Sequence, residues 1–187
     1  MRAMMISIAV LALAGCGGQE TAANTDGCAR VVTREVTWSS TDAPDTVTAR
    51  AEGPNCTQAA VILTIRNAGG ELLWAFADGH YRLTLGEAPP EGGLETTPEQ
   101  MDTFLDGWAN VSLSRSGELP EWREGVASLS ASAQTFSYDT PFDRETYEML
   151  RGRNLAMLCY AAAPEGTECL IIDPITDAPV RMVAYGP

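Results

Sequence analysis

The sequence predicts an α+β fold, and three observations carry that prediction. Residues 28–85 hold short runs rich in Val, Ile, Thr and Trp, separated by turns of Gly, Asp, Asn and Pro. Two helix starts, at residues 97 and 140, precede stretches with amphipathic spacing, and a strand-rich part follows residue 154. We therefore expect an antiparallel meander of hairpins, two inserted amphipathic helices and a C-terminal three-stranded β part.

Residues 28–56 are predicted to form a β-hairpin. The segments 31–38 and 46–51 have the composition of strands, and residues 39–45 between them supply Ser, Asp and Pro for the turn. Cys28 and Cys56 lie at equal distances from the middle of that turn. A disulfide between them would close the open end of the hairpin.

One detail of this hairpin conflicts with its pattern. Pairing centred midway between the two cysteines places Val36 opposite Thr48, although Val47 has the spacing of an inward-facing residue. A bulge or a diagonal disulfide would remove the conflict.

The meander is expected to continue to residue 85. Residues 61–67 form an apolar, β-branched run that ends at Asn-Ala-Gly-Gly, and residues 72–77 form another. Asp78-Gly79 then has the sequence of a hairpin turn before residues 81–85, which alternate as a strand does. The prediction is therefore up to five antiparallel strands.

The most clearly marked helix begins at Thr97. Thr97 is the expected N-cap, Pro98 the first helical residue, and Gln100 completes a capping box. Asp102 and Asp106 lie off the apolar stripe of this helix. The stripe consists of Met101, Phe104, Leu105 and Trp108.

A second helix is expected to begin at Thr140-Pro141, with Asp143 at its third position, and to end at Gly152. Its expected apolar face comprises Phe142, Thr146, Met149 and Leu150. Between the helices, residues 115–139 are rich in Ser and Gly, and predict no regular structure beyond a short strand near 134–138.

The C-terminal part is expected to be β-structure. Segments 154–161 and 168–173 flank Pro164-Glu165-Gly166, and residues 179–185 supply a third strand. Cys159 and Cys169 are centred on Pro164. That register places Met157 opposite Ile171 and Leu158 opposite Leu170, which are apolar pairs.

Four of the five cysteines are therefore expected to pair. Four cysteines allow three connectivities. Only Cys28–Cys56 with Cys159–Cys169 is local to both hairpins, so these two disulfides are predicted, and the placement of the cysteines in separate hairpins disfavours a zinc site.

The formal net charge of −13 restricts the partners of this chain. Such a surface disfavours nucleic acid and favours cationic partners, although simple solubility also explains it. All twelve basic residues are Arg. The absence of Lys excludes a P-loop lysine, a Ser–Lys dyad and a Schiff-base nucleophile.

No catalytic motif stands out. His80 is the only histidine and no G-x-S-x-G turn accompanies it, so we expect an ordinary surface or edge-strand histidine. The acidic residues 91, 95 and 99 are expected in a solvated loop and helix start. Four tryptophans could line a groove, but core packing is favoured: Trp38, Trp74, Trp108 and Trp122. We expect no catalytic residue, no metal site and no cofactor.

The N-terminus carries the clearest functional signal. Met1-Arg2 supplies one positive charge, and residues 4–14 form an apolar run of about ten residues, too short to span a membrane. Leu13-Ala14-Gly15-Cys16 then resembles the lipobox of bacterial lipoprotein precursors. The resemblance implies cleavage before Cys16, a diacylglycerol on its sulfur and a palmitate-type acyl chain on its amine. Gly17 implies the outer membrane, facing the periplasm.

An ordinary signal-peptidase site is the alternative, since Ala12-Leu13-Ala14 fits A-x-A and would give cleavage before Gly15. Cysteine parity favours lipidation, because a lipid on Cys16 leaves an even set of cysteines. We therefore expect a signal peptide over 1–15, a lipidated flexible tether over 16–27 and a single α+β domain over 28–187.

Three functions remain open at this level. The first is a non-enzymatic envelope domain that binds a cationic protein or cell-wall component. The second is an inhibitor of a cationic enzyme that attacks the envelope. Lysozyme inhibitors share the format of a small, disulfide-linked, lipid-anchored protein, and Gly79-His80-Tyr81 is similar to their Gly-containing loop ending in Tyr. The third, with the least support, is a carboxylate-dependent hydrolase.

The lipid anchor is directly testable. The Cys16→Ala variant should move from the membrane to the soluble periplasmic fraction, because stable anchoring requires the acyl chains. Fractionation followed by mass spectrometry of the mature N-terminus measures this. Membrane association unchanged by the substitution, or an unmodified Gly15 at the mature N-terminus, would refute the anchor.

Overall fold

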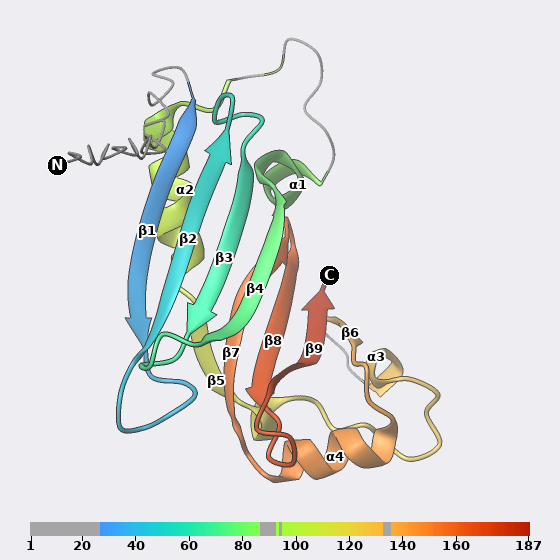
Figure 1. The fold of residues 1–187 in the computed structure, drawn as a ribbon. Coiled ribbons are helices and arrows are strands. Elements are labelled where there is room, and N and C mark those ends of the chain that lie inside the picture. Colours follow the sequence, from blue (N-terminus) through green and yellow to red (C-terminus); the bar gives the residue numbers. More distant parts are fainter. Residues whose placement is uncertain (1–26, 87–92, 94, 133–135) are drawn as a thin grey trace, which may run out of the picture.

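The computed structural model describes residues 27–86, 93, 95–132 and 136–187, and its fold is α+β, as predicted (Figure 1). The first sheet is a four-stranded antiparallel meander in the order β1-β2-β3-β4. Its strands are β1 Cys28–Val36, β2 Asp45–Gly53, β3 Ala60–Arg66 and β4 Leu72–Gly79. The meander therefore has four strands and not five.

The second sheet is also antiparallel, with five strands in the order β5-β7-β8-β9-β6. The expected three-stranded C-terminal part forms its centre, and two short strands join it at the edges. Its strands are β5 Ser112–Arg115, β6 Ser137–Asp139, β7 Ala156–Ala163, β8 Gly166–Ile172 and β9 Pro179–Gly186. Its helical neighbours are a 3₁₀ turn Ser116–Glu118, α3 Leu129–Ser132 and α4 Arg144–Gly152.

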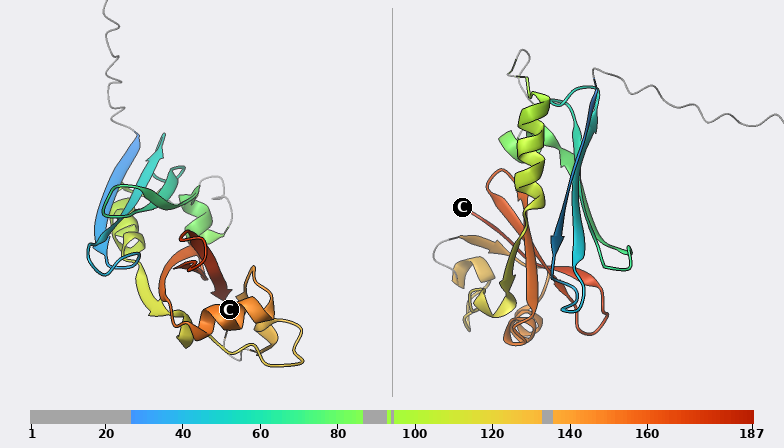
Figure 2. Two further views of the ribbon diagram at one scale, coloured as in Figure 1. Left: turned by 60° about the horizontal axis from the view of Figure 1, so that its bottom comes forward. Right: turned by 90° about the vertical axis from the view of Figure 1, so that its left-hand side faces the viewer.

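The largest hydrophobic core lies behind the first sheet. Strands alternate their side chains between two faces, so every second residue of β2 and β3 points inward. Figure 2 shows α2 and the second sheet on that inner side, while the opposite face of the first sheet is uncovered. The fully buried inner residues form one core cluster with Leu158 and Leu170 of the second sheet, and they are Val47, Ala49, Ala51, Val61, Leu63 and Ile65.

Helix α2, Pro98–Ala109, forms as its sequence predicts. Thr97 caps it, and the capping box with Gln100 is present in both directions. Met101, Leu105 and Trp108 are buried against the first sheet, and Phe104 is partly buried.

The polar side of α2 is bound to the edge strand. Arg30 and Arg34 of β1 form ion pairs with Asp102 and Asp106 of the helix. The hydrogen bonds from Arg30 lower the pKa of the Asp102 carboxyl. These pairs fix the helix over β1 and β2, although each is too exposed to stabilise the fold much.

Both predicted disulfides, Cys28–Cys56 and Cys159–Cys169, are present. The register of the first hairpin differs from the prediction, because Cys28 pairs across the strands with Gly53. Cys56 lies three residues beyond the end of β2, in the following loop, and reaches Cys28 from there. This shift lets Val47 face the core, as its spacing suggested, and the conflict disappears.

The second disulfide joins directly opposed residues of β7 and β8. The predicted register, with Met157 opposite Ile171 and Leu158 opposite Leu170, is confirmed.

The predicted fifth strand is wrong, because residues 80–85 form helix α1, His80–Leu85. Strand β4 extends through Gly79, which pairs with Ala60, so Asp78-Gly79 is not a turn. The segment also fits a helix, since His80 and Leu83 are buried three residues apart. Gly86, at φ 80°, ends the helix in the left-handed conformation that glycine adopts readily.

Helix α4 begins later than predicted. Asp143 is its N-cap, and the carboxylate accepts a hydrogen bond from the Thr146 backbone N–H at 2.8 Å. The buried face is Tyr147 and Leu150, whereas Met149 is 38% exposed. Leu150 of the expected face is therefore buried, and Tyr147, three residues before it on the same side of the helix, belongs to the buried face in place of Met149.

The connection between α2 and α4 holds more structure than its composition predicts. The strand expected near 134–138 corresponds to β6 over 137–139, while residues 133–135 lie outside the described chain. Strand β5, the 3₁₀ turn and α3 were not predicted. Cys16 and the signal segment also lie outside the described residues, within which no helix has the length and apolar composition needed to cross a bilayer.

The core of the first sheet should depend on Leu105. The Leu105→Ala variant is expected to lower the free energy of unfolding by about 2–5 kcal/mol, because Leu105 is fully buried. Asp106→Asn on the same helix is the control and should change it little, since this side chain is 57% exposed. Urea denaturation followed by circular dichroism measures both, and equal losses would contradict the packing described here.

Candidate functional site

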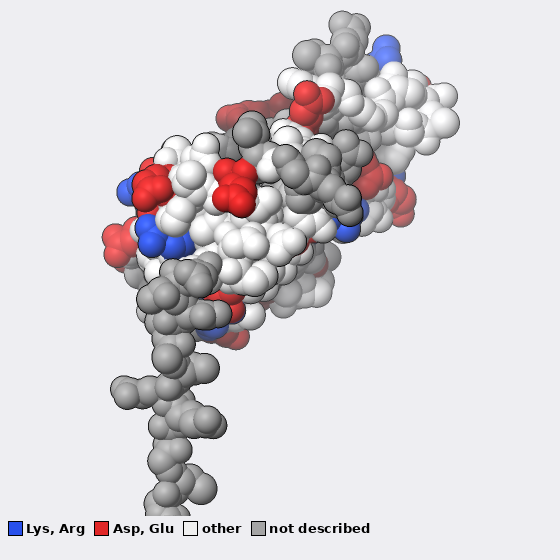
Figure 3. All heavy atoms as spheres, turned by 90° about the horizontal axis from the view of Figure 1, so that it is seen from above, with Lys and Arg blue, Asp and Glu red and all other residues white. Residues whose placement is uncertain are grey.

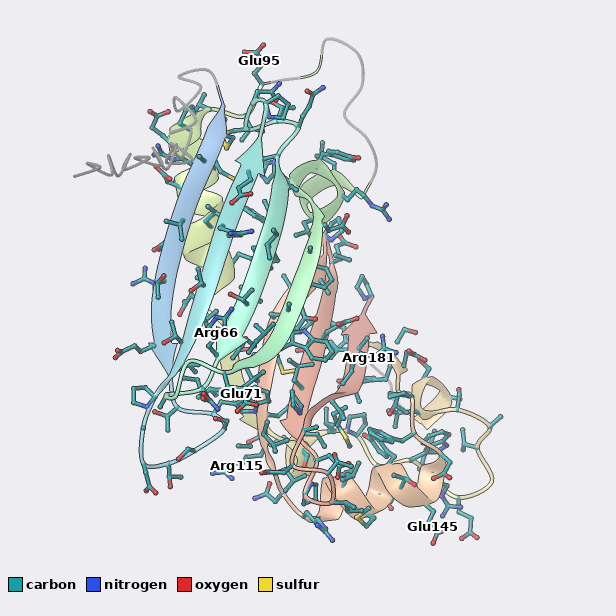
Figure 4. All side chains as sticks on the ribbon, in the orientation of Figure 1. Arg66, Glu71, Glu95, Arg115, Glu145 and Arg181 are labelled. Carbon is teal, nitrogen blue, oxygen red and sulfur yellow. A yellow bond between two sulfur atoms is a disulfide. The ribbon has the colours of Figure 1, made fainter. Side chains whose placement is uncertain are left out.

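Polar side chains gather across one face of the second sheet. The register aligns Tyr160 of β7 with Glu168 of β8, then with Ala184 of β9 and Asp139 of β6. Arg181 of β9 lies beside this row and points toward it in Figure 4. Four strands therefore bring two carboxylates, a guanidinium and a phenol to one place.

These groups form a continuous chain of hydrogen bonds. Trp74 Nε1 of the first sheet donates to Tyr160 Oη at 3.1 Å, and Tyr160 Oη donates to Glu168 Oε2 at 2.7 Å. Arg181 then donates from Nη1 to Glu168 Oε1 at 3.3 Å and from Nη2 to Asp139 Oδ2 at 3.2 Å. The chain links the core between the sheets to the surface.

Exposure rises along this chain. Tyr160 is buried, the Glu168 side chain is 20% exposed, Arg181 is 35% exposed and Asp139 is 75% exposed. Burial, together with the hydrogen bond to Glu168, raises the pKa of Tyr160. The phenol therefore stays protonated and serves as a donor.

The exposed end of the chain opens into a cleft of about 310 Å³. Small residues form much of its wall beside the two carboxylates, and Thr167 and Tyr185 line it as well; the small residues are Ser137, Ala162, Ala163, Gly166, Ala184 and Gly186. Gly186 is required by close approach, since a Cβ there would lie 2.9 Å from the Glu165 carbonyl oxygen.

The cleft suits binding of a positively charged group. Its carboxylates, Asp139 and Glu168, share one guanidinium, so the three charges leave a negative excess. Glycoside cleavage requires one of two carboxyl groups to donate a proton. In this cleft, the carboxylates of Asp139 and Glu168 both accept hydrogen bonds from Arg181. Among the described residues, no group of three or more His, Cys, Asp or Glu side chains could hold a metal ion.

The prediction for His80 is wrong. The residue is 7% exposed and begins α1, where its ring meets Phe104 edge-on at 4.8 Å between centroids. Burial lowers the pKa of the imidazole from its ordinary value of 6.5. Gly79-His80-Tyr81 accordingly spans a strand end and a helix start, and does not form the loop that the likeness to lysozyme inhibitors implies.

The other sequence candidates are structural or solvated. Trp38 and Trp108 are buried and donate to the carbonyl oxygens of Ala156 and Ala161, so core packing is confirmed for both. Trp74 and Trp122 are partly buried and also donate hydrogen bonds. Glu95 and Glu99 are exposed, as Figure 4 shows for Glu95, and Glu91 lies outside the described residues.

The sequence contained one signal for this cleft. A hairpin centred on Pro164 places Tyr160 opposite Glu168, so half of the polar chain follows from the predicted register. Asp139 and Arg181 come from strands whose positions in the sheet no local pattern indicates.

The chain matches no protein-family model, and no curated protein or solved structure is significantly similar to it. The chemistry of the cleft is therefore inferred from its own geometry.

Tyr160 should couple the two sheets. Tyr160→Phe is expected to lower the free energy of unfolding by about 1–3 kcal/mol, because Trp74 Nε1 loses its acceptor and Glu168 Oε2 loses its donor. Tyr81→Phe is the control, since none of the hydrogen bonds within the described chain involves its hydroxyl. Chemical denaturation measures the free energy of unfolding of both variants, and a Tyr160→Phe variant as stable as the wild type would contradict the coupling.

His80 should make stability depend on pH. Its pKa is lower when folded than when unfolded, so the unfolded chain binds more protons below pH 6.5. The contribution of neutral His80 to stability is therefore fully present above that pH and is lost as the pH drops through it. In the His80→Phe variant, the free energy of unfolding measured by denaturation should fall less steeply between pH 7 and pH 5 than it does in the wild type. A slope identical to the wild type would refute this assignment.

Proposed function

We propose that this chain is a lipid-anchored protein of the bacterial envelope whose folded domain binds a cationic partner and is not an enzyme. The cleft between Asp139 and Glu168 is the proposed binding site. The observation that carries the proposal is the graded chain from Tyr160 to Asp139, because it holds an exposed carboxylate on rigid strands.

The remaining charges support a cationic partner. Six arginines already pair with carboxylates within the described chain: Arg30, Arg34, Arg50, Arg82, Arg151 and Arg181. In Figure 3 some acidic patches stand apart from any basic one. The whole chain has 25 acidic and 12 basic residues, so its field attracts positive molecules and speeds their encounter.

The anchor rests on the resemblance of residues 13–16 to a lipobox. On this proposal, acyl chains on Cys16 hold the protein at the outer membrane, facing the periplasm. Residues 16–27 then act as a tether that joins the first sheet at Cys28, whereas the cleft belongs to the second sheet. The tether leaves the cleft free to meet a partner.

Inhibition of a cationic envelope-attacking enzyme is the second candidate, and the same cleft favours it. A protruding Arg or Lys of such an enzyme could enter between Asp139 and the small walls. A carboxylate-dependent hydrolase has less support, since Arg181 occupies both carboxylates.

Hen lysozyme serves as the cationic probe. Asp139→Asn is expected to weaken binding about fivefold, or about 1 kcal/mol, because it removes the exposed carboxylate of the cleft. Asp42→Asn, which removes an exposed carboxylate from the β1–β2 loop, is the matched control and should bind as the wild type does. Calorimetric titration at low and physiological salt measures all three.

Equal weakening by both substitutions would mean that net charge alone attracts lysozyme, and the cleft proposal would fail. Inhibition of lysozyme's lytic activity that persists at high salt would favour the inhibitor over the general binding domain.

A further inference from the structure

The opposite face of the second sheet carries a second hollow, of about 200 Å³. It lies over β5, β7 and β8, at the end where α2 leads into β5. Although the chain has 25 acidic residues, every side chain that lines this hollow is uncharged. Its chemistry therefore differs from that of the carboxylate cleft.

The register explains the hollow. Ala161, Thr167 and Tyr185 are opposed across β7, β8 and β9, so they lie on the face opposite to Tyr160 and Glu168. Ala161 is exposed and small, and it leaves the floor open between larger neighbours on each side. Helix α4 covers this face lower down, where Leu150 packs in the core cluster.

Three polar side chains at this hollow are available to a ligand. Within the part of the chain that the structure describes, the carboxamide of Asn110 and the hydroxyls of Ser112 and Thr167 make no hydrogen bond. Each of these groups can both donate and accept. Asn110 and Ser112 are exposed, so neither is fixed by packing.

Aromatic rings extend from one wall of the hollow. Tyr185 lines it and packs against Tyr138 and Phe136, with ring centroids 5.4 Å and 5.7 Å away. Phe136 is 43% exposed. Aromatic rings offer an apolar face, and tyrosine adds a polar tip, so this row provides a platform beside the polar groups.

We propose that this face of the second sheet binds a neutral saccharide. One sugar ring lies over Ala161 with its apolar C–H face toward Tyr185, while its hydroxyls bond to Asn110, Ser112 and Thr167. Further units of the glycan run over Tyr138 and Phe136.

The lining selects this class of ligand. A purely apolar ligand would leave the hydroxyls and the carboxamide without partners, and a charged ligand would find no counter-charge in the hollow. A saccharide combines hydroxyls that donate and accept with an apolar ring face. The site goes beyond the proposed binding of a cationic partner. It shares Thr167 and Tyr185 with the wall of that cleft and Tyr160 with its polar chain, but none of the contacts proposed for the saccharide involves the carboxylates Asp139 and Glu168.

The probe is chitotriose, with cellotriose to separate recognition of the ring from that of its acetamido group. Saturation-transfer NMR locates contacts, and titration gives the affinity. Ala161→Leu, which fills the hollow from an exposed position, and Tyr185→Ala, which removes the wall, should each weaken binding at least about tenfold. Tyr185→Phe keeps the ring and should retain most of the affinity.

Two further variants are controls. Thr33→Val on the uncovered face of the first sheet and Asp139→Asn in the carboxylate cleft should both bind the saccharide as the wild type does. Thermal unfolding verifies that each variant folds, and Ala161→Leu tests the hollow even if Tyr185→Ala does not fold.

Three results would overturn the proposal. The first is a wild-type protein that binds neither saccharide. The second is unchanged affinity in folded Ala161→Leu, and the third is loss of saccharide binding in Asp139→Asn. Because the lysozyme titration uses other residues, failure of this site is distinguishable from failure of the cationic-partner site.

Discussion

Burial of the inner face of the first sheet is the constraint on which the rest of the structure depends. Val47, Leu63 and their neighbours on alternate positions of β2 and β3 must leave water, and no single element is large enough to cover them. Helix α2 and the second sheet share that task. Leu105 covers one part of the face, and Leu158 with Leu170 covers another.

This arrangement explains why polar residues converge where they do. Tyr160 lies on the face of the second sheet that packs into the core, so its hydroxyl needs a partner, and it has two, in Trp74 and Glu168. Toward β6 the second sheet extends beyond the elements that pack against this face, and the face becomes accessible to solvent at Asp139. The carboxylate cleft is thus the exposed continuation of a buried structural network.

The two-residue period of a strand gives the second sheet two chemically different faces. Glu168 and Ala184 line only the acidic cleft, whereas the adjacent Thr167 and Tyr185 alternate to the other face and also line the uncharged hollow. A domain with this construction can present the two proposed sites, one for a cationic partner and one for a saccharide, at once. Basic proteins and glycans occur together at the bacterial envelope, which is the location proposed for this protein.

Local chemistry determined much of this protein. The capping box at Thr97, the apolar stripe of α2, the pairing of Cys159 with Cys169 and the hairpin register around Pro164 all follow from residues near one another in the chain. The envelope location that residues 13–16 imply stays a prediction, and it too depends on a few consecutive residues. Such features are readable because the interacting groups are set by short-range spacing.

Only the tertiary structure decided the remainder. Residues 80–85 fit both a strand and a short helix, and burial of His80 with Leu83 selected the helix. The first hairpin shifted its register because Val47 had to face the core, with Cys56 displaced into a loop. Asp139 meets Arg181 only because β6 pairs with β9 at the sheet edge, and that pairing joins segments more than forty residues apart. Local sequence cannot specify such contacts, because the free energy that selects them comes from the packing of the whole domain.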